Sequence, residues 1–173
     1  MNMIYDFAKK PIIILGCGNV LFGDDGFGPA VVEYLETRYA LPETVLVQDM
    51  GTSIQEFLFD LMIAPQKPKR VFIIDALSQE GRNPGELFEI DLSQFPQHKI
   101  SGRPIHQFPS VNQIQELAKL TGTQFRILVV QSQFLPENVS PGLSQTVQAA
   151  IPRACDWLTK EIGNEALTDF NPN

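Results

Sequence analysis

A glycine-rich turn near the start of the chain carries two adjacent acids and constrains the fold more than any other segment. The turn spans residues 16–29 and reads GCGNVLFGDDGFGP. It follows an apolar run at residues 12–15 that predicts a buried strand, and it precedes residues 30–35, which predict a helix. Asp24 and Asp25 are therefore expected beyond the carboxyl end of a strand, at the edge where open α/β sheets build their sites.

The composition is that of a globular protein with an acidic surface. Of the 173 residues, 43% are hydrophobic and 19% are charged, and the formal net charge is −7. This length predicts a single domain over residues 1–173 with a sizeable core. Nucleic acid is not expected as a partner, because the sequence has no basic patch beyond the short stretch at residues 67–70.

Export and membrane insertion are not indicated. The first ten residues lack the apolar stretch of a signal peptide, and no apolar run approaches the roughly 20 residues that span a bilayer. The two cysteines, Cys17 and Cys155, lack the spacing of a metal site, so reduced thiols are the simplest interpretation. We therefore expect a cytoplasmic protein with no membrane partner and no organic cofactor.

Apolar runs and helical periodicities alternate along the chain and predict the order βαβαββαβα. Strands are expected at residues 11–16, 44–48, 70–75, 86–92 and 125–131, and helices at 28–38, 53–63, from 110 and from 143 to 162. Ser53 and Ser110 each open a capping box at the start of a helix. Pro152 is expected to kink the last helix.

The apolar run at residues 71–74 indicates a strand that is buried on both faces, as in a parallel sheet. The strand at 86–92 follows too closely for a crossover helix, so we expect it to run antiparallel to the strand at 70–75. Right-handed crossovers then predict a three-layer α/β/α sandwich. Its twisted five-stranded sheet is mostly parallel, with one antiparallel strand.

Three positions are candidates for chemistry, because each follows a strand or lies in a long loop. They are the Asp24–Asp25 pair, Asp75 and His106, the last in the irregular segment 93–109. Since the carboxyl ends of neighbouring parallel strands lie side by side, Asp25 and Asp75 can converge, and the long loop can bring His106 over them. Two carboxylates and one imidazole form a ligand set that suits Zn, Ni, Mn or Fe(II).

Each candidate also has a simpler interpretation. An Asp at a strand end often forms a turn, a single loop histidine is often solvated, and one of two adjacent acids can favour the dipole of the next helix. Cys17 could be a nucleophile, but no base lies near it in the sequence, and we interpret it as a small buried residue. The three sites together, in this order, are more informative than any one of them.

Two other α/β classes fit the sequence poorly. A phosphoacceptor receiver domain has its acidic pair directly after the first strand and a lysine after the fifth. Here the pair begins eight residues beyond Gly16, and Gln131 is followed by Ser-Gln-Phe. A dinucleotide-binding fold needs a third glycine where Leu21 or Phe22 stands, and its pyrophosphate would face the acids.

The chain resembles the nickel–iron hydrogenase maturation endopeptidases over about residues 11–160. The resemblance is carried by the pattern Gly16-x-Gly18-Asn19-x-Leu21-x-x-Asp24-Asp25-x-x-Gly28, then Asp75-Ala76 and His106-Gln107. Residues 49–52 match a Gly-Thr element of that family, and residues 140–152 match its C-terminal signature. Residues 21–29 are most similar to the branch that serves deazaflavin-reducing hydrogenases of methanogens. The resemblance implies a five-stranded α/β/α domain.

The same resemblance implies an endopeptidase that removes a C-terminal extension from the hydrogenase large-subunit precursor after nickel insertion. The precursor is then the partner, and it carries the nickel. The metal-contacting residues of the family correspond to Asp25, Asp75 and His106. The first is commonly glutamate in relatives, and Asp24 is retained as its alternative or as a catalytic base. A non-catalytic nickel-sensing assembly chaperone is the alternative function, because the same ligands would serve it.

A groove for the extended C-terminal peptide is also expected beside this site. Its location is suggested by residues 51–52 and by the long loop at 92–109.

Overall fold

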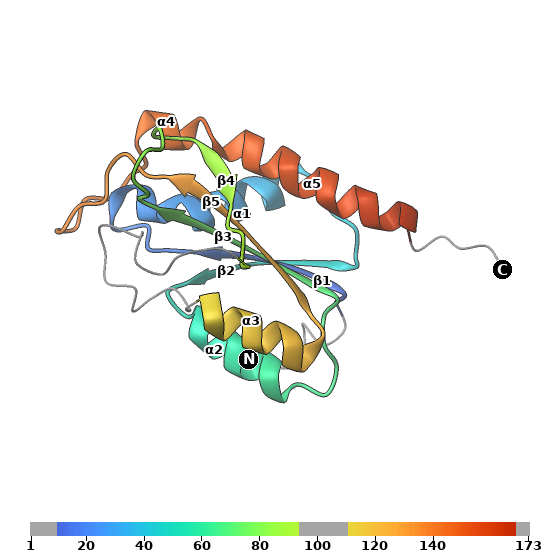
Figure 1. The fold of residues 1–173 in the computed structure, drawn as a ribbon. Helices are drawn as coiled ribbons and strands as arrows, with labels where there is room; N and C mark the ends of the chain where they lie inside the picture. Colours follow the sequence, from blue (N-terminus) through green and yellow to red (C-terminus); the bar gives the residue numbers. More distant parts are fainter. Residues whose placement is uncertain (1–9, 94–110, 169–173) are drawn as a thin grey trace.

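A five-stranded sheet forms the centre of the computed structural model, which describes residues 10–93 and 111–168, without the side chains of 164–168 (Figure 1). The strands are β1 (Ile12–Cys17), β2 (Val45–Gly51), β3 (Arg70–Leu77), β4 (Leu87–Glu89) and β5 (Gln124–Gln131). Their spatial order is β2-β1-β3-β5-β4. Pairs β1–β2, β1–β3 and β3–β5 are parallel, and β4 pairs antiparallel with β5. The predicted mixed sheet is confirmed.

The edge strand β4 differs from its prediction in length and in partner. It runs against the direction of β3, as expected, but its hydrogen-bonded neighbour is β5, which lies between the two. Both edges of β3 are already occupied, by β1 and by β5. The short strand that follows instead pairs with the outer edge of β5.

Helices cover both faces of the sheet, as Figure 1 shows. The helices α1 (Phe27–Arg38), α4 (Gln145–Gln148) and α5 (Ile151–Thr168) pack on one face, and α2 (Ile54–Ile63) and α3 (Val111–Thr121) pack on the other. Alternate residues of β1 serve the two cores: Ile13 and Leu15 face α2 and α3, whereas Ile12 and Ile14 face α1 and α5. This burial on both sides explains the continuous apolar runs and confirms the three-layer arrangement.

Three details at the helix ends differ from the predictions. The last helix is divided into α4 and α5, and Pro152 lies in the first turn of α5 instead of kinking it. A proline is tolerated there because its missing N–H would have no acceptor within the helix. Ser53 precedes α2 as predicted, but its side chain makes no capping hydrogen bond. Ser110 lies outside the described residues.

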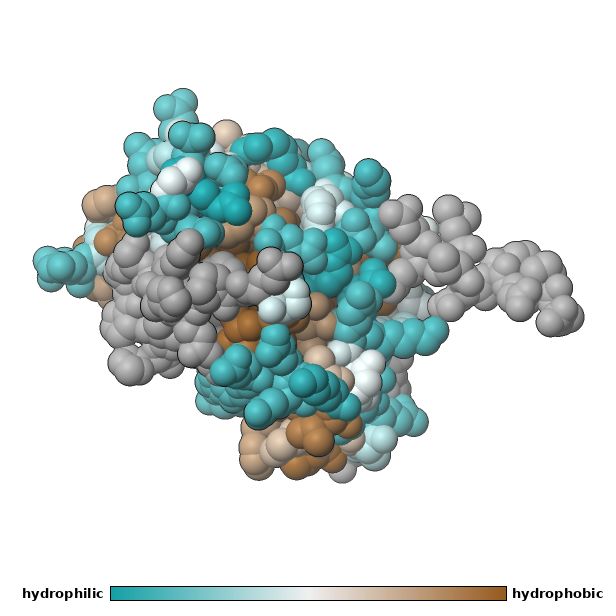
Figure 2. All heavy atoms as spheres, viewed as in Figure 1, coloured by the Kyte–Doolittle hydropathy of each residue, from teal (hydrophilic) through white to brown (hydrophobic). Residues whose placement is uncertain are grey.

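The face seen in Figure 2 is mostly hydrophilic, and one of its apolar groups lies over α2 and α3, brown at the bottom. Its exposed side chains are Phe59, Met62 and Ile63 of α2 and Leu120 of α3. Met62, Ile63 and Leu120 lie near the C-terminal ends of their helices, at the amino ends of the strands and away from the acidic turn. None of the helices in residues 10–93 and 111–168 combines the length and the apolar character needed to cross a membrane.

Candidate functional site

The acidic turn between β1 and α1 depends on two glycines that let backbone segments approach closely. Gly18 has φ +124°, and a Cβ there would lie 1.8 Å from the carbonyl oxygen of Asp25. A Cβ at Gly28 would lie 2.2 Å from the carbonyl oxygen of Cys17 and 2.5 Å from that of Ile74. These contacts bring the start of α1 directly against β1 and β3, and they bring the backbone of Asp25 against the end of β1.

Asp25 lies in a single 3-10 turn, η3 (Gly23–Gly26), and α1 begins at Phe27, one residue before its predicted start. The backbone N–H of Asn19 donates to Oδ2 of Asp25 at 2.9 Å, and the N–H of Asp25 donates to the carbonyl of Phe22 at 3.2 Å. Asp25 is buried. The loop that carries Asp25 therefore also orients its carboxylate.

Asp75 lies beside this turn in β3, which continues to Leu77, beyond the strand end predicted at residue 75. Its Oδ1 accepts a hydrogen bond from the N–H of Ala76 at 2.7 Å. The Cβ position at Gly18 lies 3.6 Å from Oδ1 of Asp75 and also touches the carbonyl of Asp25. The structure therefore brings these two acids together at the carboxyl edge of the sheet.

The protonation of Asp75 depends on its burial and on the neighbouring Asp25. Asp75 is half-buried as a residue, while its carboxyl group is enclosed by protein. Burial raises the pKa of Asp75 to about 7, opposed by the hydrogen bond from Ala76 and reinforced by the negative charge of Asp25. A carboxyl group that titrates near neutral pH beside a second carboxylate is typical of functional sites.

Asp24 is engaged elsewhere, although it is the next residue in the chain. Its side chain is fully buried. The carboxylate accepts hydrogen bonds from the N–H groups of Gln133 (2.7 Å), Phe134 (2.7 Å) and Ser144 (2.6 Å), and from the Ser144 hydroxyl (3.0 Å). Of the two adjacent acids, Asp25 is therefore the one that adjoins Asp75.

Cys17 is a buried core residue, as its sequence context predicted. It lies at the end of β1 in the core beneath α2 and α3. Burial, followed by the charges of Asp75 and Asp49, raises the pKa of the Cys17 thiol well above its usual value. The thiolate is the nucleophilic form, so this environment disfavours nucleophilic catalysis by Cys17.

The third predicted ligand, His106, lies outside the described residues, as does most of the 92–109 loop. Within residues 10–93 and 111–168, no group of three or more His, Cys, Asp or Glu side chains is placed to hold a metal ion. The structure thus brings together Asp25 and Asp75. The role of His106 stays a prediction.

Nothing in the sequence predicts that residues 132–144 enclose Asp24. Ser144 stands at the N-cap of α4, but its hydroxyl donates to Asp24 instead of capping the helix. The available signal was chemical: an acid in a buried glycine-rich turn requires hydrogen-bond donors. The sequence did not show which distant segment supplies them.

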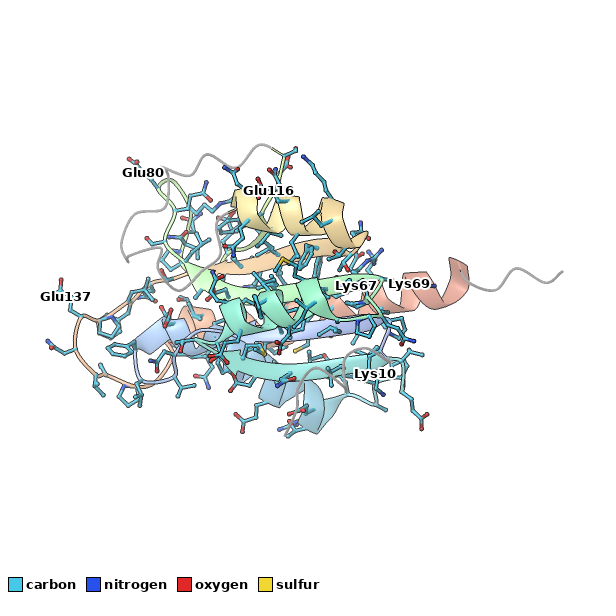
Figure 3. The ribbon with its side chains drawn as sticks, turned by 90° about the horizontal axis from the view of Figure 1, so that it is seen from below. Lys10, Lys67, Lys69, Glu80, Glu116 and Glu137 are labelled. Carbon is cyan, nitrogen blue, oxygen red and sulfur yellow. The ribbon has the colours of Figure 1, made fainter. Side chains whose placement is uncertain are left out.

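Charged side chains are distributed unevenly between the two ends of the molecule. Figure 3 shows Glu80 and Glu137 at one end, and Lys10, Lys67 and Lys69 toward the other. Glu80 follows β3, and Glu137 belongs to the segment 132–144, so both lie at the end that holds Asp25 and Asp75. Glu80 and Glu137 thus add acidic side chains to the end of the molecule that holds Asp25 and Asp75.

Several known proteins are similar to this chain in sequence and fold. A family model described as hydrogenase maturation protease matches residues 29–161. The chain is 32% identical over 158 residues to the coenzyme F420 hydrogenase subunit delta of Methanothermobacter thermautotrophicus, with coverage of 88% of this chain and 94% of the relative. It is 30% identical over 161 residues to the hydrogenase 2 maturation protease of Escherichia coli, with coverage of 90% and 94%.

Solved structures with this fold include the hydrogenase maturating endopeptidase HybD of E. coli. Its TM-score is 0.68 at 26% identity, over 89% of this chain and 93% of that one. The maturation protease HycI of Thermococcus kodakarensis shares the fold with a TM-score of 0.69 at 21% identity, over 92% and 97% of the two chains. The family model, the curated relatives and the shared fold agree, and the chain therefore belongs to the hydrogenase maturation protease family, whose members are endopeptidases.

Proposed function

We propose that this endopeptidase removes a C-terminal extension from the precursor of a nickel–iron hydrogenase large subunit after nickel has been inserted. The observation that carries the proposal is the adjacent pair Asp25 and Asp75, at the carboxyl edge of the sheet in a member of this family. The similarity to a subunit of a coenzyme F420 hydrogenase supports a substrate from that class of hydrogenase. The free thiols of Cys17 and Cys155 support action in a reducing cytoplasm.

In this proposal nickel arrives as part of the substrate. Asp25 and Asp75 offer carboxylate oxygens, and His106 would add an imidazole nitrogen, which together suit a divalent transition metal. A precursor that carries nickel brings positive charge and open coordination positions to these acids. A precursor without nickel offers no cation to these adjacent acids, so the difference in binding would select the loaded precursor.

The protonation of Asp75 supports the selection of a nickel-loaded precursor. Because the pKa of Asp75 lies at about 7, this carboxyl group is partly protonated at neutral pH in the free enzyme. A nickel-bearing precursor would displace that proton, since metal ligands bind in their deprotonated form. Nickel held in this way would polarise the scissile carbonyl or a bound water. The carboxylate of Asp25, oriented by the N–H of Asn19, would then orient or deprotonate the water.

The direct test is the mass of the precursor after mixing with the enzyme. We expect wild-type protein to shorten the nickel-loaded precursor at its C-terminus and to leave the nickel-free precursor intact. Asp25→Ala, Asp75→Ala and His106→Ala should each abolish processing while circular dichroism shows a folded chain. Glu36→Gln, an exposed change on α1, is the control and should process normally.

The possible results separate the proposal from its alternative. A stable complex without a change in mass would indicate the non-catalytic assembly chaperone. Cleavage of the nickel-free precursor would refute selection by nickel. Normal processing by His106→Ala would remove that residue from the proposed ligand set.

The groove for the extended peptide is a separate part of the proposal. Gly51 lies at the end of edge strand β2, and its carbonyl accepts a hydrogen bond from the N–H of Gly18 at 2.9 Å, so this edge leads directly to the acidic turn. Deletion of residues 97–103 should raise the precursor concentration needed for half-maximal processing. An unchanged concentration would count against the loop as part of the groove.

A further inference from the structure

We infer that Asp24 is a positioning residue: its buried carboxylate locks the segment 132–144 onto the acidic turn and so fixes Asp25 beside Asp75. The importance of that placement for catalysis rests on the proposed function. The hydrogen bonds that hold residues 132–144 against Asp24 can be measured without any substrate.

The hydrogen bonds around Asp24 leave it little capacity for proton transfer. Oδ2 accepts from the N–H groups of Gln133 and Phe134 and from the Ser144 hydroxyl, and Oδ1 accepts from the Ser144 N–H. An ionised carboxylate has about four acceptor sites, and four donors converge on this one. A general base needs an acceptor site directed at the proton that it removes. In this geometry the acceptor sites of Asp24 are directed at the protein.

Backbone hydrogen bonds join the same two segments next to this carboxylate. The N–H of Asp24 donates to the carbonyl of Phe134 at 3.0 Å, and the N–H of Gly23 donates to the carbonyl of Ser140 at 2.9 Å. In return, the N–H of Ser140 donates to the carbonyl of Leu21 at 2.9 Å. The acidic turn is therefore fastened to segment 132–144 through both its main chain and the Asp24 side chain.

Asp24 and Asp25 are adjacent residues in the same hydrogen-bonded turn. Both residues belong to η3, and the N–H of Asp25 bonds back to Phe22, inside the fastened stretch. The Asp25 carboxylate meets the N–H of Asn19 at the start of the same loop. A change that releases Asp24 should therefore rotate the turn and alter the Asn19–Asp25 hydrogen bond.

The experiment compares Asp24→Asn with Asp25→Asn by amide hydrogen exchange and by the NMR resonances of backbone N–H groups. An amide in place of the Asp24 carboxylate turns an NH₂ group toward N–H donors. We therefore expect exchange at Gln133, Phe134 and Ser144 to accelerate by roughly tenfold or more. The Asn19 resonance should also move, because it reports the position of the Asp25 carboxylate. The matched variant Asp25→Asn should move the Asn19 resonance and leave the other three amides protected.

Ser144→Ala provides a milder variant in case Asp24→Asn does not fold, since it removes one donor and leaves the carboxylate in place. It should change the same amides in the same direction by a smaller factor, and it should slow processing without abolishing it. In a double variant with Asp24→Asn, Ser144→Ala should accelerate amide exchange little further, because both changes break the same contact.

Two results would overturn the inference. If Asp24 acts as the base, Asp24→Asn will abolish processing with wild-type exchange at all four amides, and Ser144→Ala will process normally. If Asp24 only stabilises the fold, exchange will accelerate at Gln133, Phe134 and Ser144 while the Asn19 resonance stays in place. If wild-type protein fails to process any precursor, the proposed function fails, but the exchange data still decide whether Asp24 positions Asp25.

Discussion

At the scale of single residues, the carboxyl group of Asp75 links folding stability to pH. Its pKa is raised from 3.8 to about 7 in the folded chain, mainly by burial. Between these two pH values the folded chain keeps a proton that the unfolded chain has released. The free energy of unfolding attributable to this group therefore falls as the pH rises through this window, and it stays reduced above it.

Replacement of Asp75 by asparagine should remove this penalty. We expect Asp75→Asn to exceed wild type in free energy of unfolding by about 4 kcal/mol at pH 8, because a pKa raised from 3.8 to about 7 costs about 1.4 kcal/mol per unit. The difference should shrink steadily as the pH is lowered toward 4. Urea unfolding at several pH values measures it, and Glu36→Gln should follow wild type throughout. Equal stability of Asp75→Asn and wild type at pH 8 would show that the carboxyl group is not desolvated.

The close contact at Gly18 gives a second prediction for a single residue. Alanine there would combine a positive φ with a Cβ placed 1.8 Å from the carbonyl of Asp25. Gly142 also has a positive φ, +108°, but a Cβ there would meet nothing within 4 Å, so it is a matched control. We expect Gly142→Ala to cost about 1–2 kcal/mol and Gly18→Ala at least about 3 kcal/mol in the free energy of unfolding. Similar losses for both variants would mean that the turn yields to the added methyl group.

At the scale of elements, prediction from the sequence succeeded where a pattern is local. The strands β1, β3 and β5 were identified because residues buried on both faces form continuous apolar runs. The partner of β4 was not identifiable, because it depends on which edges the other strands leave open. The break between α4 and α5 was also missed, since the apolar spacing continues across it and only the position of Pro152 in the first turn reveals the new start.

The position of Pro152 can be tested against the kink that the sequence predicted. In the first turn of α5 the proline removes no intrahelical hydrogen bond, so Pro152→Ala should change the free energy of unfolding by less than about 1 kcal/mol. Lys160→Pro, an exposed substitution in the interior of the same helix, should cost about 3 kcal/mol or more. Chemical denaturation of the two variants measures both effects. A loss for Pro152→Ala as large as that for Lys160→Pro would place the proline inside a continuous helix.

At the scale of the whole molecule, the site joins parts of the chain that are far apart in the sequence. Asp25 and Asp75 could be placed together from the sequence, because both follow runs that predict neighbouring parallel strands. The donors to Asp24 could not, since Gln133 and Phe134 lie 109 and 110 residues away along the chain. Local patterns therefore identify the acids, whereas the long-range fold decides which of the adjacent pair is enclosed and which adjoins Asp75.

This site predicts that Ni²⁺ binding, the protonation of Asp75 and the free energy of unfolding depend on one another. If Asp25 and Asp75 act together as ligands, excess Ni²⁺ alone should bind the folded chain and stabilise it. The gain in the free energy of unfolding would be about 2.7 kcal/mol when Ni²⁺ is present at 100 times its dissociation constant. Protons compete for the Asp75 carboxylate, whose pKa is about 7, so the gain should be larger at pH 8 than at pH 6.

Thermal unfolding with and without Ni²⁺ measures this linkage, and a chelator should reverse the stabilisation. Asp25→Asn and Asp75→Asn should each lose most of the Ni²⁺-dependent rise in Tm, because each removes one ligand. Glu36→Gln should keep it, because this exposed carboxylate on α1 is not part of the proposed ligand set. A rise in Tm that survives in the Asp25→Asn, Asp75→Asn double variant would mean that Ni²⁺ binds elsewhere. The proposed recognition of nickel by Asp25 and Asp75 would then lose its physical basis.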